Sequence, residues 1–127
     1  MIFVIFLFLC LPLPAATPAV DDVFYRLYNY EFEASVSAAD AYIAAQPNDP
    51  MGHTARASAF LFSELHRLNL LGKEFMTSDD RIKTKEKLIP KDTAQREFAR
   101  SISETRRLAG NRTDADSLLA LTIAAGL

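Results

Sequence analysis

Apolar residues recur at helical spacing through nearly the whole chain beyond its first 19 positions. The clearest stripe has members separated by four, three and four residues: Phe32, Val36, Ala39 and Ile43. This spacing returns to one side of a helix that has about 3.6 residues per turn. Weaker stripes predict further helices within residues 22–28, 51–71, 93–109 and 115–125. The chain is therefore expected to be all-α, with antiparallel helical hairpins.

One segment, residues 46–50, reads Gln-Pro-Asn-Asp-Pro and predicts a sharp stop and restart. Pro47 disfavours helix at the residue before it. Asp49 suits the N-cap of the next helix, and Pro50 suits its first position. The third helix should therefore begin at Pro50.

Aspartate and glycine predict the remaining helix boundaries. The boundaries are expected at Asp21 or Asp22, Gly72, Asp92 and Gly110. An aspartate can accept hydrogen bonds from first-turn N–H groups, and a glycine after the last turn can adopt the left-handed conformation. Gln95 stands three residues after Asp92, which is the spacing of a capping box.

The first 19 residues predict an export signal. Residues 2–11 are an unbroken apolar run, followed by Pro12, Pro14 and small residues up to Ala19. A bilayer span needs about 20 apolar residues, whereas this run has the length of a signal-peptide core. We expect cleavage after Ala19 and a periplasmic or secreted mature protein. The alternative is a retained membrane anchor formed by residues 2–11.

Length, charge and cysteine content restrict the class further. The chain has 127 residues and a formal net charge of -2, so one domain is expected and the basic surface needed for nucleic acid is missing. The only cysteine is Cys10, which leaves no disulfide framework and no cysteine-based metal site. We predict no cofactor and no metal.

The residues that could act in catalysis or metal binding are better interpreted as structural or surface residues. His53 and His66 are 13 positions apart on one expected helix, which rotates them about 140° away from each other. Asp79 and Asp80 are typical turn residues without a third ligand. We therefore predict no catalytic site. The basic run at 83–91 is interpreted as a solvated loop, although it could lie near lipid head groups if the N-terminal segment is retained.

Two segments resemble the tetratricopeptide repeat of exported bacterial proteins. Residues 30–34, Tyr-Glu-Phe-Glu-Ala, are similar to the aromatic and acidic opening of that repeat's second helix, and residues 44–50 look like its exit. The resemblance implies a short solenoid over residues 20–127, with an insertion at about 73–91. Residues 115–125 would begin a further repeat. Because the last residues to Leu127 are apolar and offer no polar cap, we expect the natural chain to continue; the alternative is that another surface covers this helix.

The resemblance also implies a function and a binding surface. Stacked hairpins display their first helices on a concave side that holds a protein or peptide partner. The candidate partner-binding residues are Arg26, Asn29, His53, Arg56 and Phe60. Arg56 stands where the repeat prefers an apolar residue, and Phe60 is alternatively a core residue. The predicted function is an exported interaction scaffold without catalysis. The alternative is the N-terminal helical part of a larger exported or membrane-anchored enzyme or transport component.

Overall fold

The structure, a computed structural model, describes residues 16–72 and 89–127. Its helices are α1 (Val20–Tyr28), α2 (Phe32–Ala45), α3 (Pro50–Arg67), α6 (Asp92–Ala109) and α7 (Ala115–Gly126). No strand occurs in these two ranges, so the predicted all-α class is confirmed. Most of the predicted signal segment, most of the predicted insertion and the pair Asp79 and Asp80 lie outside the described residues.

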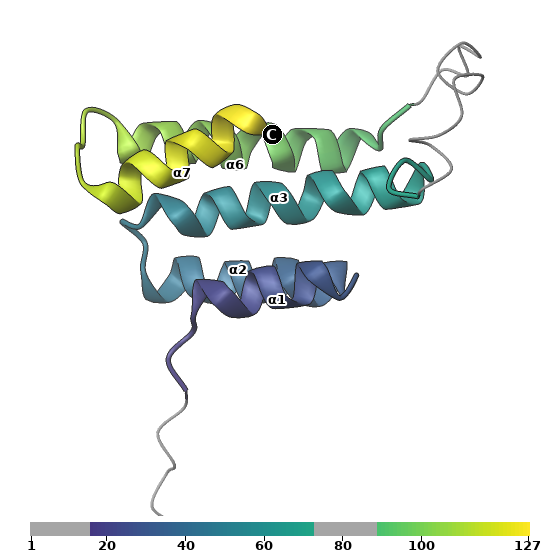
Figure 1. The fold of residues 1–127 in the computed structure, drawn as a ribbon, viewed down its shortest axis with the longest axis horizontal. Coiled ribbons are helices and arrows are strands. Elements are labelled where there is room, and N and C mark those ends of the chain that lie inside the picture. The colour runs from purple at the N-terminus through teal and green to yellow at the C-terminus, as the bar shows by residue number, and fades with distance from the viewer. Residues whose placement is uncertain (1–15, 73–88) are drawn as a thin grey trace, which may run out of the picture.

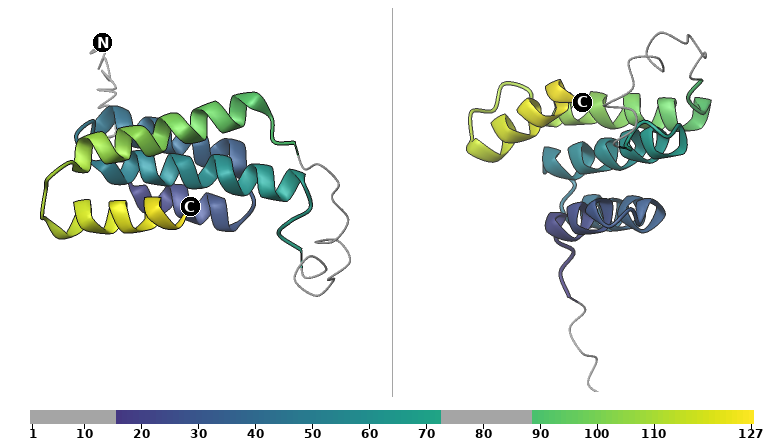
Figure 2. Two further views of the ribbon diagram at one scale, coloured as in Figure 1. Left: turned by 90° about the horizontal axis from the view of Figure 1, so that it is seen from above. Right: turned by 45° about the vertical axis from the view of Figure 1, so that its right-hand side comes forward.

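The helices form three tiers, with α3 in the middle (Figure 1). The hairpin of α1 and α2 lies on one side of α3, and the hairpin of α6 and α7 lies on the other. Helix α3 contacts all four of the others. Figure 2, left, shows α1 and α7 along one flank of α3 and α2 and α6 along the opposite flank. We call the surface formed by the first flank and α3 the α1–α3–α7 face.

The first hairpin is shaped by an unusual turn residue. Helix α1 ends at Tyr28, and Tyr30 adopts a left-handed conformation with φ of 62°. The N–H groups of Tyr30 and Glu31 donate back to the carbonyls of Leu27 and Arg26, at 3.1 and 2.9 Å. These two bonds form a Schellman motif, which satisfies carbonyls at the helix end. The chain thus reverses within three residues to begin α2.

The start of α1 differs from the prediction. Ala19 is the N-cap, and no side chain caps the helix. Asp21 and Asp22 lie inside the first turn, where their charge is favourable toward the positive end of the helix dipole. The predicted aspartate cap was therefore wrong, because the helix begins two residues earlier at Val20.

The start of α3 is as predicted, and its end is not. The Asp49 carboxylate accepts from the Met51 N–H at 2.9 Å, and Pro50 occupies the first helical position. The helix ends at Arg67, because Asn69 takes the left-handed position with φ of 57°. The Leu70 N–H then donates to the Leu65 carbonyl at 2.8 Å. Asparagine tolerates this conformation, so the chain turns before it reaches Gly72.

The start of α6 is capped from a distant element. The predicted capping box of Asp92 and Gln95 is wrong, because Asp92 is already helical and Lys91 is the N-cap residue. The Lys91 N–H donates to the Glu64 carboxylate of α3 at 3.0 Å. A side chain 27 residues away therefore holds this end of α6. Gly110, with φ of 43°, ends the helix as predicted.

Small side chains fill both sides of α3. Toward α1 and α2, Val23, Ala39 and Ala55 form a buried cluster; toward α6 and α7, the cluster is Ala57, Ile102 and Ala124. At Gly52 a β-carbon would lie only 2.9 Å from side-chain atoms of Ile43 and Tyr42. Helices α2 and α3 therefore approach closely where glycine leaves room. None of the helices within 16–72 and 89–127 is both long and apolar enough to cross a bilayer.

Candidate functional site

An open, mostly aromatic pocket of about 450 Å³ lies between α1 and α3 on the α1–α3–α7 face. It is lined by Phe24, Leu27, Tyr28, Tyr30, Phe62 and Leu71. Tyr28 is 88% exposed, Tyr30 58% and Phe62 36%. Large aromatic side chains this exposed in a hollow mark a surface that is suited to a partner. We call this the aromatic pocket.

Local sequence explains how α1 presents these side chains. Positions 24 and 28 are one turn apart, and Leu27 stands beside them on the same side of the helix. Val23 faces the core and is fully buried, so the stripe on α1 is wider than the core can cover. The remaining part of the stripe forms the pocket wall.

Tyr30 joins this wall to α3. Its left-handed backbone places the ring against Phe32 and His66, with ring centroids 5.9 and 5.4 Å apart. Phe32 and His66 also meet, at 5.3 Å. The turn between α1 and α2 is thus held to the last turn of α3 by three rings. The pocket edge at Tyr30 is fixed by this cluster.

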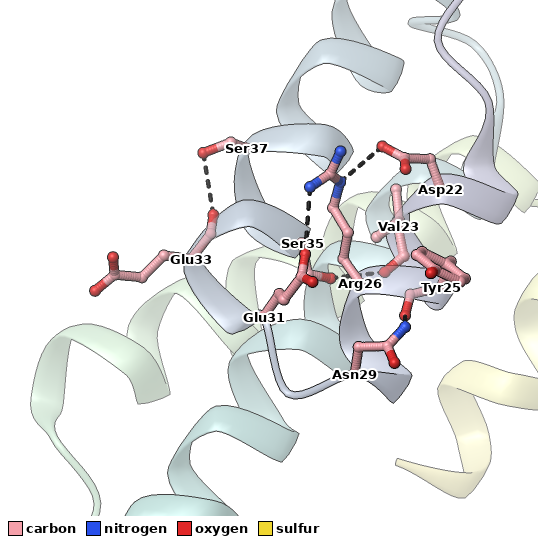
Figure 3. A network of polar contacts seen from close by, with 9 residues as sticks. All are labelled: Asp22, Val23, Tyr25, Arg26, Asn29, Glu31, Glu33, Ser35 and Ser37. Carbon is pink, nitrogen blue, oxygen red and sulfur yellow. Dashed lines mark hydrogen bonds and ion pairs between the residues drawn. The ribbon is translucent and has the colours of Figure 1, made fainter.

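Two of the predicted partner-binding residues are engaged within the first hairpin. The Arg26 guanidinium donates to Asp22 at 2.9 Å and to Glu31 at 3.4 Å (Figure 3). These carboxylates, Asp22 before Glu31, raise the pKa of Arg26. The Asn29 amide donates to the Tyr25 carbonyl at 2.8 Å. Both side chains help to hold α1 and its turn, and neither lines the aromatic pocket.

A second hollow, of about 230 Å³, holds two other predicted residues. It is lined by Asp40, Ile43, His53, Arg56, Arg100, Ser101 and Glu104, so it lies among α2, α3 and α6. Arg56 spans this hollow: its Nε donates to Asp40 at 2.7 Å, and its Nη1 donates to Glu97 at 2.8 Å and to Ser101 at 3.1 Å. The guanidinium also lies 4.8 Å from the centre of the Phe60 ring. Arg56 therefore ties three helices together.

The charges in this second hollow are already balanced. Burial opposes the charge of Arg56, but its hydrogen bonds to Asp40 and Glu97 and the charges of these carboxylates together outweigh burial and raise its pKa. Burial lowers the pKa of His53, and the neighbouring arginines lower it further against the opposing effect of Glu104. His53 is therefore predominantly neutral near pH 7. The hollow is lined by two carboxylates and two arginines, so a neutral imidazole there offers a ligand little net attraction.

The five predicted residues thus fall into two separate groups. Arg26 and Asn29 belong to the first hairpin, while His53, Arg56 and Phe60 belong to the α2–α3–α6 side. The pocket-lining Phe24, Tyr28 and Phe62 lie within the weaker stripes at 22–28 and 51–71, and none of them was predicted as a binding residue. A usable signal was present, because Tyr25, Tyr28 and Tyr30 crowd a short helix and its turn.

Comparison with known proteins adds no relative. A scan against family models finds no match for this chain, and neither do searches of curated proteins and of solved structures. Within residues 16–72 and 89–127, no group of three or more His, Cys, Asp or Glu side chains is placed to hold a metal ion. The aromatic pocket is the site that the geometry favours for binding.

Proposed function

We propose that this protein is an exported interaction scaffold of the tetratricopeptide-repeat type, which holds a peptide segment of a partner on its α1–α3–α7 face and does not catalyse a reaction. The observation that carries the proposal is the set of neighbours of each helix. Helix α3 contacts α1, α2, α6 and α7, whereas neither member of the first hairpin contacts either member of the second.

This set of neighbours is what a stack of helical pairs requires, in which α1 pairs with α2, α3 pairs with α6, and α7 begins a further pair. Helices α1, α3 and α7 run in one direction, and α2 and α6 run in the other (Figure 1). Each helix of the first kind then contacts the next of its kind, as α1 contacts α3 and α3 contacts α7. Repeats that contact only their sequence neighbours build an extended binding surface from one helix of each pair.

The aromatic pocket supplies an anchor point on that surface. Partly exposed aromatic rings around a hollow of about 450 Å³ suit one or two bulky apolar side chains of a partner. Tyrosine and phenylalanine provide large contact areas with few rotatable bonds, so little conformational entropy is lost on binding.

A paired substitution on α3 tests this assignment. Peptides are selected from a displayed random library against the protein, and their affinities are measured by fluorescence anisotropy. Phe62→Ala should weaken binding about tenfold or more, as expected for an interface anchor. Phe60→Ala is the matched control, because Phe60 lies beside Arg56 on the other flank of α3 and should leave affinity unchanged.

Two results would overturn the assignment. If the selected peptides depend on Phe60 and Arg56 but not on Phe62, the site lies in the α2–α3–α6 hollow instead. If selection yields no specific peptide, the chain is not a peptide-binding scaffold.

Export is tested by the intact mass of the protein recovered from its native cells. Our proposal predicts an N-terminus at Val20 and recovery in the periplasmic or secreted fraction. A chain that retains residues 1–19 and sediments with membranes would support the anchored alternative and contradict cleaved export.

A further inference from the structure

We propose that the partner segment is cationic as well as apolar: a bulky side chain fills the aromatic pocket while a lysine or arginine about three residues away meets carboxylates at the other end of the α1–α3–α7 face. This inference rests on the proposed function, because it specifies the chemistry of the peptide that this face would hold.

The first carboxylate belongs to the pocket's own helix. Asp21 precedes Phe24 by three residues and Tyr28 by seven, so the three lie along one side of α1. Asp21 is exposed, and no ion pair among the described residues involves it. Its neighbour Asp22 lies about 100° further around α1 and is engaged by Arg26 (Figure 3).

The second carboxylate comes from α7. Asp116 stands one turn before Ala120, whose carbonyl lies 3.4 Å from the Thr54 hydroxyl of α3. Asp116 is therefore directed along the side of α7 that meets α3. It is exposed, and within the described ranges it also takes part in no ion pair.

Tyr42 lies within the electrostatic reach of both carboxylates. Its pKa is raised to about 12, first by burial, then by the hydrogen bond to Asp49, and further by the charges of Asp49, Asp116 and Asp21. The carboxylates of α1 and α7 thus act on one hydroxyl, although they belong to different hairpins. The arginine at this end, Arg112, is engaged by Asp114 at 3.1 Å and by the Asn48 carbonyl at 3.0 Å. Asp21 and Asp116 therefore have no ion pair among the described residues.

The opposite end of the face is apolar and also favours a positive charge. The C-termini of α1 and α3 both lie there, beside the aromatic pocket (Figure 1). Helix C-termini carry partial negative charge, and aromatic faces attract cations. Among the described residues that line this pocket, none has a basic side chain that would pair with a carboxylate.

The spacing of the two features sets the expected spacing in the peptide. Seven residues of helix separate Asp21 from Tyr28, which corresponds to about 10 Å at a rise of about 1.5 Å per residue. An extended chain covers that distance in about three residues. A bulky residue and a lysine should therefore stand about three positions apart.

A symmetric peptide presents a lysine three residues from the phenylalanine whichever way its chain runs along the face. The probe is acetyl-Lys-Gly-Ser-Phe-Ser-Gly-Lys-amide, with matched peptides that carry glutamine or glutamate in place of both lysines. Binding is followed by heteronuclear NMR titration of the full chain at low ionic strength. The lysine peptide should bind about fivefold more tightly than the glutamine peptide, given the modest strength of exposed ion pairs, and the glutamate peptide should bind most weakly.

Variants assign the preference to the two carboxylates. Asp21→Asn with Asp116→Asn should abolish the preference for lysine over glutamine without loss of the glutamine peptide's affinity. Asp22→Asn is the matched control, because it removes the same charge from the same turn, about 100° further around α1. It should preserve the preference.

The outcomes separate this inference from the proposed function. If all three peptides bind the aromatic pocket equally, and Phe62→Ala weakens all of them, the scaffold function stands and the cationic specificity is overturned. If the glutamate peptide binds best, the specificity is likewise overturned. If no peptide perturbs the resonances of the α1–α3–α7 face, the binding surface itself is rejected and the inference with it.

Discussion

The two sides of α3 are both built from small residues, yet they are held by different forces. Toward α1 and α2, the buried contacts of Val23, Ala39 and Ala55 are apolar, and Ser35 contributes a single hydroxyl bonded to the Val23 carbonyl at 2.9 Å. Toward α6, the Thr54 and Thr105 hydroxyls lie 3.1 Å apart. Both of these threonines are fully buried.

The difference shows how polar groups can replace apolar volume at a close helix contact. Each threonine hydroxyl also bonds to a carbonyl of its own helix, at Pro50 for Thr54 and at Ser101 for Thr105. Among the described side chains, no buried nitrogen or oxygen lacks a hydrogen-bond partner. Burying hydroxyls is tolerable only under that condition. The second hairpin therefore depends on geometry that the first does not need.

The largest expected effect tests what the two sides share, which is close packing. Ala55→Leu on the first side and Ala57→Leu on the second should each reduce the free energy of unfolding by about 2–3 kcal/mol, because both positions are fully buried and extra carbons force neighbours apart. Urea denaturation measures the change. Ala41→Leu, at an exposed position of α2, is the control and should change stability by less than about 0.5 kcal/mol.

If only one of the two leucine variants is destabilised, the sides differ in packing density as well as in polarity. That result would contradict the description of both contacts as closely packed.

The next effect tests the hydroxyl pair itself. Thr105→Val preserves shape but removes one bonding partner of Thr54, and should cost about 1 kcal/mol. Combining it with Thr54→Val should cost less than the sum of the single changes, because the two hydroxyls act on each other. Additive losses in this double-mutant cycle would mean that the contact between the two hydroxyls adds no stability beyond the hydrogen bonds that each makes within its own helix.

A smaller effect should appear as a pH dependence confined to the second side. Burial lowers the pKa of His53 in the folded protein below its usual value of 6.5. The unfolded chain therefore binds a proton more readily, so stability should fall as pH drops below about 6.5. Unfolding measured at pH 7.5 and 5.5 should show a loss below about 1 kcal/mol that disappears in His53→Gln. An unchanged loss in that variant would assign the pH dependence to other groups.

The smallest effect concerns helix ends. Helix α6 ends with Gly110 at a positive φ, whereas α3 ends with Asn69 in the left-handed conformation. Asn69→Gly should change stability by only a few tenths of a kcal/mol, since glycine relieves strain but adds freedom to the unfolded chain. Thermal denaturation of the two proteins would reveal any change in stability larger than this. A loss above about 1 kcal/mol would reveal a contact of the Asn69 side chain that matters for stability.

Local signals in the sequence predicted much of the fold. The helical stripes gave the all-α class, and Asp49 with Pro50 gave the start of α3 correctly. Gly110 likewise ended α6 as predicted. These features depend on residues within one helical turn of each other, so their physics can be deduced without knowledge of tertiary contacts.

The errors arose where distant residues decide the outcome. Lys91 is the N-cap residue of α6, and its N–H bonds to Glu64, a residue of another helix. The partners of Arg56, Asp40 and Glu97, were likewise not predicted, because they come from other helices; its role in partner binding stays a prediction. A sequence pattern identifies an arginine at a position that is usually apolar, but it does not reveal which carboxylates of other helices form ion pairs with it. The aromatic pocket was missed for a related reason, since apolar stripes do not distinguish covered from uncovered rings.

Because α3 packs against both hairpins, it also determines how the molecule unfolds. No helix of the first hairpin contacts a helix of the second, so both hairpins depend on α3 for their helix contacts outside themselves. A single helical hairpin cannot bury its apolar face alone, and separation of either hairpin exposes one side of α3 to solvent. Unfolding should therefore be one cooperative event, with backbone amides of α3 exchanging with solvent last of all. The stability of α3 therefore determines how long the whole fold stays closed to hydrogen exchange.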